Sequence, residues 1–186
     1  MGKGIGGHTR AHRGATDDWI TPRHIVGALG RFDLDPCACI PQPWPCAHKS
    51  YNRNDDGLAQ PWSGRAWVNP PYAQAEPFLA RLAEHGDGVA LLFARTETAM
   101  FHKYVWSEAD ALLFLKGRLY FHRPDGTRAT GNAGGPSVLI AYGRANALAL
   151  RNSSLDGAFV ELSQPSGTAD ARSHKVNAAC TGETTD

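Results

Sequence analysis

The sequence predicts an α/β fold with a largely parallel sheet, and three observations support this class. Stretches with apolar residues at helical spacing alternate with short, continuous apolar runs, as in helices that alternate with strands covered on both faces. The length of 186 residues suits one core. The composition changes at both ends, so we expect a disordered basic arm over residues 1–14, one domain over residues 15–163 and a disordered polar tail over residues 164–186.

The first half of the domain contains two expected strands and one helix. Thr21 and Pro22 supply a hydroxyl N-cap and a proline at the first helical position, so a helix is expected from here to Gly30. A short strand over residues 32–35 would end in the carboxylate of Asp35. A connection rich in proline and polar residues then runs to residue 62, and residues 65–68 form the next strand.

The second half repeats the alternation. Its expected elements are a helix from Pro77 to Gly86, a strand over 89–94, a helix around 100–105, strands over 111–115, 119–121 and 137–142, a helix over 145–150 and a strand over 158–162. In parallel sheets ligands bind at the carboxyl ends of strands. Because Asp35 and Asn69 both follow strands, we expect them to share one cleft.

The overall charge of +1 excludes a general polyanion binder, but the basic residues are unevenly placed. Lysine, arginine and histidine occur in residues 1–14 without any acid, so this arm could contact phosphates without reading sequence; a solvated flexible tail is the alternative. No apolar stretch has the length of a membrane span, and the N-terminus has no apolar signal-peptide core. We expect a cytoplasmic protein, in a bacterial cell or a phage-infected host.

The most informative motif is Asn69-Pro70-Pro71-Tyr72, which directly follows the apolar residues 66–68. Proline stiffens the bend and removes backbone donors, so its carbonyls remain available. The Asn69 oxygen and the Pro70 carbonyl could both accept from one amino group, and Tyr72 offers a flat face beside them. Such an arrangement suits methyl transfer to the exocyclic amine of a nucleobase, because the two acceptors offset the charge that develops on nitrogen. A plain strand-to-loop turn is the alternative.

Three cysteines and a histidine form a C-x-C-x6-C-x-H pattern: Cys37, Cys39, Cys46 and His48. Zinc binding is one interpretation. The spacing matches no common zinc finger, and the intervening residues 40–45 are rich in stiffening proline. We therefore expect reduced, buried cysteines and no metal.

Several stretches, in this order, resemble the phage-type DNA N-6-adenine methyltransferases (the phage Dam family). They are Asp18-Trp19-Ile20-Thr21-Pro22, Leu34-Asp35-Pro36-Cys37-Ala38, Asp56-Gly57-Leu58 with Trp62, Trp67 to Tyr72, Ala94 to Thr98 with Phe101-His102, Lys116 to Leu119 and Gly135-Pro136-Ser137. The resemblance covers roughly residues 17–143. The evidence for it is that all these motifs occur together, in the same order and with similar spacing.

The resemblance implies an enzyme that uses S-adenosylmethionine to methylate N6 of adenine in double-stranded DNA. The implied catalytic residues are Asn69, Pro70, Pro71 and Tyr72, which would hold and stack on a base flipped out of the duplex. The implied cofactor-binding residues are Trp19, Thr21, Pro22, Asp35, Pro36 and Asp56.

The implied fold is a Rossmann-like methyltransferase domain with an abbreviated cofactor half, because Asp35-Pro36-Cys37-Ala38 replaces a glycine-rich turn. No separate target-recognition domain is visible in the sequence, so loops of this domain must contact DNA.

The candidate DNA-contacting residues are Arg95, Thr96, Lys116 and Arg118. We expect a monomer or weak dimer. The alternatives are an amino-group methyltransferase of the same fold acting on cytosine N4 or another acceptor, and a catalytically idle module that binds DNA or cofactor.

Overall fold

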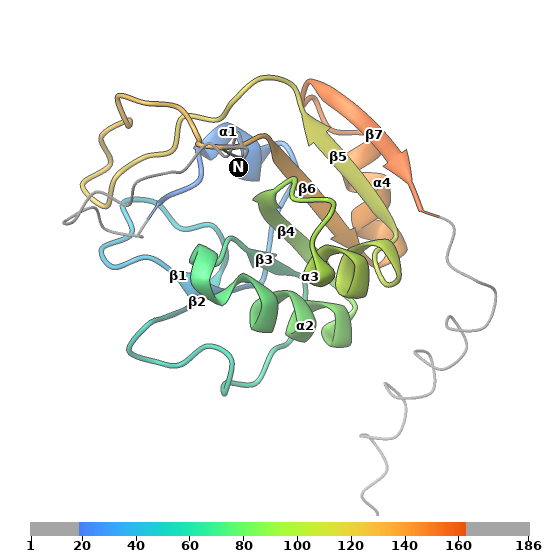
Figure 1. Ribbon diagram of the computed structural model, residues 1–186. Coiled ribbons are helices and arrows are strands. Elements are labelled where there is room, and N and C mark those ends of the chain that lie inside the picture. The colour runs from blue at the N-terminus through green and yellow to red at the C-terminus, as the bar shows by residue number, and fades with distance from the viewer. Residues whose placement is uncertain (1–18, 163–186) are drawn as a thin grey trace, which may run out of the picture.

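The computed structural model describes residues 19–162, and these form one seven-stranded sheet with helices on both faces (Figure 1). The expected basic arm (residues 1–14) and polar tail (residues 164–186) lie outside the described residues. The strand order is β2-β1-β3-β4-β6-β5-β7. The described helices include none with both the length and the apolar character required to cross a membrane.

The strands are short, and most are buried on both faces. Their bounds are β1 Leu34–Ala38, β2 Lys49–Asn52, β3 Ala66–Val68, β4 Gly88–Phe93, β5 Ala111–Leu115, β6 Ser137–Tyr142 and β7 Gly157–Glu161. Side chains alternate between two apolar cores along β4, where Val89 and Leu91 pack on one face and Ala90 and Leu92 on the other. This double burial explains the continuous apolar run in the sequence.

The sheet is mixed rather than largely parallel, which corrects the sequence-based expectation. Strands β2, β1, β3 and β4 pair in parallel, whereas β6 pairs antiparallel with both β4 and β5, and β7 pairs antiparallel with β5. The apolar runs of β5 and β6 are buried on both faces. The sequence pattern of such a run is the same for parallel and antiparallel strands, so it does not predict strand direction.

The helices cover the two faces as separate groups. On one face lie α2 (Ala75–His85), α3 (Ala99–Phe101) and the π-helical turn η2 (His102–Trp106); on the other lie α1 (Arg23–Gly27) and α4 (Arg144–Arg151). Figure 1 shows α2 and α3 together on one side of the sheet. The helix α2 ends at Gly86, which adopts the left-handed conformation (φ 74°) that glycine tolerates at a helix C-terminus.

Four local predictions are wrong by different amounts. Thr21 is not the N-cap of α1, because Pro22 occupies that position and its carbonyl accepts from the Ile25 amide. The helix α2 begins two residues before Pro77, after a 3-10 turn η1 over Tyr72–Gln74. Strand β2 falls inside the stretch interpreted as a connection, and residues 119–121, interpreted as a strand, belong to a loop.

A fifth error concerns Asp35. The strand β1 continues past it to Ala38, so the carboxylate lies within the strand instead of at its end. Pro36 is tolerated there because the pairing of β1 with β2 shifts register between Asp35 and Ala38.

Candidate active site

The candidate site lies where the strand order of the parallel half reverses. From β1 the chain forms β2 on one side and then crosses to form β3 on the other side. The strands β1 and β3 share a single register pair, Leu34 with Ala66, so they separate toward their carboxyl ends. A reversal of this kind leaves a crevice between the strand ends, which is the usual ligand site in open α/β sheets.

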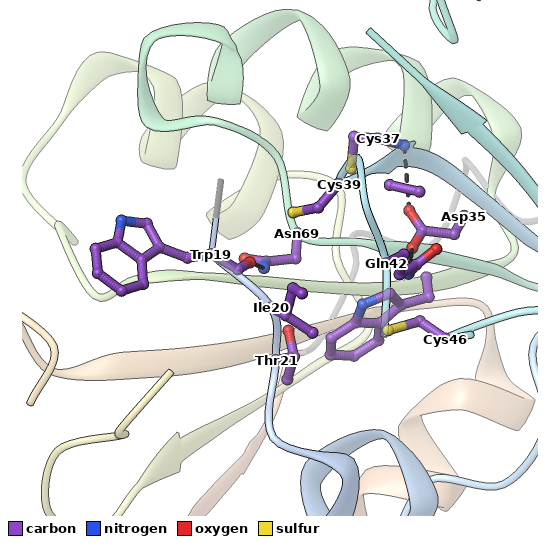
Figure 2. A pocket seen from close by; sticks show the side chains of 11 residues that line it. Trp19, Ile20, Thr21, Asp35, Cys37, Cys39, Gln42, Cys46 and Asn69 are labelled. Atoms are coloured by element: carbon purple, nitrogen blue, oxygen red, sulfur yellow. Dashed lines mark hydrogen bonds between the residues drawn. The ribbon is translucent and has the colours of Figure 1, made fainter. Parts of the chain in front are cut away.

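A small cavity occupies this position and confirms that Asp35 and Asn69 share one site (Figure 2). Its volume is about 10 Å³, which is room for about one water molecule. Its other lining residues are Trp19, Ile20, Thr21, Cys37, Ala38, Cys39, Gln42, Cys46 and Trp67. The Trp19 indole extends away from the other labelled side chains (Figure 2) and is 39% exposed.

The Asn69 side chain is held by the main chain of the segment before α1. Its Nδ2 donates a hydrogen bond of 3.1 Å to the Trp19 carbonyl. A carbonyl oxygen can only accept, so the amide must turn its nitrogen toward Trp19 and its Oδ1 away from it. Among residues 19–162, this contact leaves the acceptor atom of Asn69 as the end of the amide without a hydrogen-bond partner.

The two prolines after Asn69 differ in what their carbonyls do. The Pro71 carbonyl accepts from the Gln74 amide at 2.8 Å and so starts the turn η1. In the described chain, no main-chain donor reaches the Pro70 carbonyl. Within residues 19–162 the Pro70 carbonyl is therefore an acceptor without a main-chain donor, in the residue that follows Asn69.

Tyr72 stands at the surface with its ring close to two side chains, Phe93 and Arg95. It is 60% exposed, its ring centroid lies 6.1 Å from that of Phe93, and the guanidinium of Arg95 lies 5.8 Å from its centroid. Phe93 is the last residue of β4, so this cluster forms at the same edge of the sheet as Asn69. An exposed aromatic face beside a cation is suited to stacking with a flat, electron-rich ring.

Asp35 is almost fully buried and organises the end of β1. Its Oδ1 accepts from the Cys37 amide at 3.1 Å and its Oδ2 accepts from Gln42 Nε2 at 3.3 Å. Burial raises the pKa of Asp35 to about 7, although both hydrogen bonds oppose this effect. Gln42 was not identified from the sequence, since a lone glutamine in a proline-rich loop carries no distinctive pattern.

A second, larger cavity of about 430 Å³ adjoins the first, and Cys37 and Ala38 line both. This volume falls in the range of cofactor and small-molecule sites. The predicted residues Pro36 and Asp56 line it, together with Pro71 of the tetrapeptide. The residues that sequence reasoning missed here are Ile40, Asn52, Arg53, Gly57, Leu58, Gln74 and Phe78.

The backbone around Asp56 and Gly57 is shaped to fit against β1. Asp56 has a positive φ of 50°, which is uncommon for a residue with a side chain. Gly57 is buried, and a Cβ atom there would overlap the carbonyl oxygen of Pro36. This close approach requires glycine and sets the wall of the larger cavity.

The other predicted residues lie outside both cavities. Pro22 is buried at the start of α1. The Thr96 carbonyl accepts from the Trp106 indole, Lys116 forms an exposed ion pair of 2.9 Å with Asp156, and Arg118 donates to the Ala133 carbonyl.

The cysteine pattern forms no metal-ligand cluster. Within residues 19–162, no group of three or more histidine, cysteine, aspartate or glutamate side chains is arranged to hold a metal ion. Burial raises the pKa of Cys46 to about 12 and the pKa of Cys37 well above its usual value, and the charge of Asp35 adds to both shifts. Burial therefore favours the neutral thiol over the thiolate at both positions.

Comparison with known proteins identifies one family. The model of the family described as DNA N-6-adenine-methyltransferase (Dam) matches residues 8–151, which include β1 to β6 and all of α4. Searches of curated proteins and of solved structures gave no match.

Proposed function

The chain belongs to the DNA N-6-adenine-methyltransferase (Dam) family, which implies DNA adenine methyltransferase activity. On this premise we propose that it transfers a methyl group from S-adenosylmethionine to N6 of an adenine flipped out of double-stranded DNA. The observation that supports this most directly is the position of the Asn69–Tyr72 segment. Asn69 lines the small cavity, Pro71 lines the large one, and Tyr72 is exposed beside them.

The larger cavity fits a nucleoside-containing methyl donor. Its apolar side chains, among them Ile40, Leu58 and Phe78, can cover an adenine ring, while Asn52 and Asp56 supply polar groups for a sugar. At the small cavity the Thr21 hydroxyl is buried without a hydrogen-bond partner in the described chain, so a polar ligand group there would satisfy it. When bound, S-adenosylmethionine supplies an electrophilic methyl group on a sulfonium.

The remaining cofactor residues act by shaping these cavities. Asp35 holds the Cys37 amide and Gln42, which fixes the segment that separates the two cavities. Pro36 forms the wall against which Gly57 packs. Pro22 begins α1 and so holds Thr21 and the Trp19 carbonyl in place.

The acceptor amine is positioned by two oxygens. In the proposed mechanism, Asn69 Oδ1 and the Pro70 carbonyl each accept one hydrogen of the adenine N6 amine. This draws the nitrogen lone pair out of conjugation with the ring and offsets the positive charge that develops as the methyl group arrives. The Trp19 carbonyl keeps Asn69 from rotating, so the acceptors need no reorganisation during transfer. The methylated amine then loses a proton to water.

Tyr72 provides the stacking face for the extruded base. An amine within a duplex is hidden in the base stack, so the adenine must leave the helix before it can react. Base-on-tyrosine stacking compensates part of that cost. Arg95, next to Tyr72, is then placed to meet the DNA backbone at the point of extrusion, while Thr96, Lys116 and Arg118 extend the contact along the same edge of the sheet.

The test is a transfer assay with chemical identification of the product. Purified protein is incubated with methyl-labelled cofactor and unmethylated double-stranded DNA, and the DNA is digested to nucleosides and separated. The proposal expects label in N6-methyladenine, and its loss in the Asn69→Ala variant. Label in N4-methylcytosine would instead support the related cytosine activity. Binding of DNA and cofactor without transfer of label would show a catalytically idle module.

A further inference from the structure

Residues 121–129 form a short hairpin that the proposed catalytic mechanism does not use. Its tip is closed by hydrogen bonds of 2.8 Å from the Arg123 amide to the Thr127 carbonyl and from the Gly126 amide to the Arg123 carbonyl. Its base is closed by a 2.8 Å bond from the Ala129 amide to the Phe121 carbonyl. The hairpin is therefore a formed element with a fixed direction.

The hairpin is attached directly to the segment that holds Asn69. Ile20 and His122 exchange two main-chain hydrogen bonds of 2.9 Å, and Ile20 follows Trp19, whose carbonyl accepts from Asn69. At the tip, a Cβ at Gly126 would lie 3.4 Å from Pro43. Figure 1 shows this loop reaching out from the sheet past α1. The hairpin thus pairs with Ile20, which lines the small cavity.

Arginine and aromatic side chains gather on and around this hairpin. The Arg128 guanidinium lies 4.1 Å from the centroid of the Tyr120 ring, and the Arg23 guanidinium lies 4.8 Å from that of Trp44. Trp44 also packs edge-on against His122, at 5.0 Å between centroids. We call Arg23, Arg123 and Arg128, with the rings of Trp44 and Tyr120, the basic hairpin surface. Its three arginines are exposed.

Within the described part of the chain, these arginines are only weakly compensated by acidic side chains. Across residues 19–162, none of the three forms an ion pair. The nearby carboxylate of Asp125 accepts from the amide and the hydroxyl of Thr127, which fixes it within the turn. These hydrogen bonds, and to a smaller extent the charge of Arg123, lower the pKa of Asp125. Burial lowers the pKa of His122, and the positive charge of Arg128 and the proximity of His24 lower it further. With three arginines beside one carboxylate, the basic hairpin surface has a net positive charge.

We propose that the basic hairpin surface binds backbone phosphates of the DNA duplex next to the extruded adenine. This inference rests on the proposed function and adds a DNA-contacting element to it. An arginine stacked on an aromatic ring keeps its N–H groups in the plane of the guanidinium, where they can reach two oxygens of one phosphate. The aromatic support also limits the conformational entropy that is lost on binding.

The arrangement favours phosphate contacts over the reading of bases. Two of the three guanidinium groups lie against rings that belong to the protein, so their position is set before DNA arrives. Contacts of this kind fix the register of a protein on the duplex, while sequence is read elsewhere. The surface would hold the DNA strand in place while the base next to it leaves the stack.

The experiment compares two charge-matched double variants of the full chain. Arg123→Gln/Arg128→Gln removes two charges from the hairpin. Arg144→Gln/Arg151→Gln removes two charges from α4, which lies at a distance from the hairpin (Figure 1). Duplex DNA binding is measured by fluorescence anisotropy over a range of KCl concentrations. Cofactor affinity is measured in parallel to establish that each variant is folded.

The expected result is a specific change in salt dependence. Loss of two phosphate contacts should reduce the slope of log K against log[KCl] by about 1.8. The hairpin variant should show this loss and the α4 variant should not. Arg123→Lys/Arg128→Lys, which keeps both charges, should retain most of the slope.

A hairpin variant whose slope equals that of the α4 variant would overturn the inference while leaving the proposed function intact. A wild-type protein that neither binds nor methylates duplex DNA would overturn both.

Discussion

Asn69 and Trp19 are joined by a hydrogen bond from the asparagine Nδ2 to the tryptophan main-chain carbonyl, 3.1 Å long. The partners belong to the loop after β3 and to the segment before α1. Because the acceptor is main chain, the position of the Asn69 amide depends on where residues 19–22 run and not on the side chain at position 19. The acceptor atom of the proposed catalytic residue is thus oriented by the fold itself.

The first prediction concerns Asn69 itself. Asn69→Ala removes one of the two acceptors proposed for the adenine amine, and loss of one preorganised group of this kind costs about 10²–10³-fold in turnover. The dissociation constant of the cofactor should change only a few-fold, because Asn69 does not line the larger cavity. Single-turnover methyl transfer and calorimetric cofactor binding measure the two quantities. Wild-type turnover in the variant would refute the catalytic role.

Tyr72 is predicted to act through its ring and not its hydroxyl. Tyr72→Phe should leave methyl transfer within a few-fold of wild type. Tyr72→Ala should weaken productive DNA binding by about 5- to 150-fold, since stacking of one base contributes about 1–3 kcal/mol. Steady-state kinetics over a range of DNA concentrations distinguishes these outcomes. Equal losses in both variants would mean that the hydroxyl matters and that stacking does not explain the site.

Gly57 is predicted to be required for the larger cavity. Gly57→Ala would place a methyl group against the Pro36 carbonyl and push the two segments apart, a strain of about 1–3 kcal/mol. Cofactor affinity should fall by about 5- to 150-fold. Gly131→Ala is the matched control, because a Cβ there meets no atom within 4 Å. Equal cofactor affinity in the two variants would separate this cavity from cofactor binding.

Asp35 should make stability depend on pH in a defined direction. Its pKa is about 7 in the folded protein against an ordinary value of 3.8, so the folded state binds the proton more tightly than the unfolded state does. The contribution of Asp35 to the unfolding free energy is therefore present below about pH 4 and is lost as the pH rises from about 4 to 7. Asp35→Asn removes this loss and keeps an acceptor for the Cys37 amide.

Relative to the Asp35→Asn variant, wild type should lose about 3 kcal/mol of unfolding free energy between pH 5 and pH 8. Urea denaturation of both proteins at the two pH values measures this difference. If wild type and Asp35→Asn differ in unfolding free energy by the same amount at pH 5 and at pH 8, the pKa of Asp35 is not raised in the folded protein.

Asn146 should contribute to stability without affecting the site. It is fully buried, donates to Asp87 and to the Tyr142 carbonyl at 2.7 Å each, and accepts from Arg65. Asn146→Leu keeps the volume but leaves Arg65 and Asp87 with fewer partners, which should cost about 3 kcal/mol of unfolding free energy. The exposed Arg144→Ala is the control. Specific activity of the folded variant should equal that of wild type, because this network lies at the opposite edge of the sheet.

The sequence predicted best where burial and chemistry coincide. The strands β4 and β6 are apolar runs buried on both faces, and both were located within one residue. Asn69 and Asp35 were expected in one cleft and do line one cavity. The edge strand β2 was missed because it exposes most of its residues, so its sequence has the polar composition of a loop.

Other features depend on contacts between distant segments. The direction of β6 follows from its pairing with β4 and β5, which no local pattern records. Residues 119–121 read as a strand, but they lead into the hairpin that pairs with Ile20. Gln42 reaches Asp35 only because the loop after β1 folds back over the strand. Each of these arises from tertiary packing that overrides local propensity.

The two outer strands of the sheet have a further consequence for how the protein behaves at high concentration. Both β2 and β7 are short, mostly exposed and carry charge, with Lys49 on one and Glu161 on the other. Outer strands of this kind discourage other polypeptides from adding to the sheet. Many copies could then crowd along one nucleic acid molecule without aggregating through their sheets.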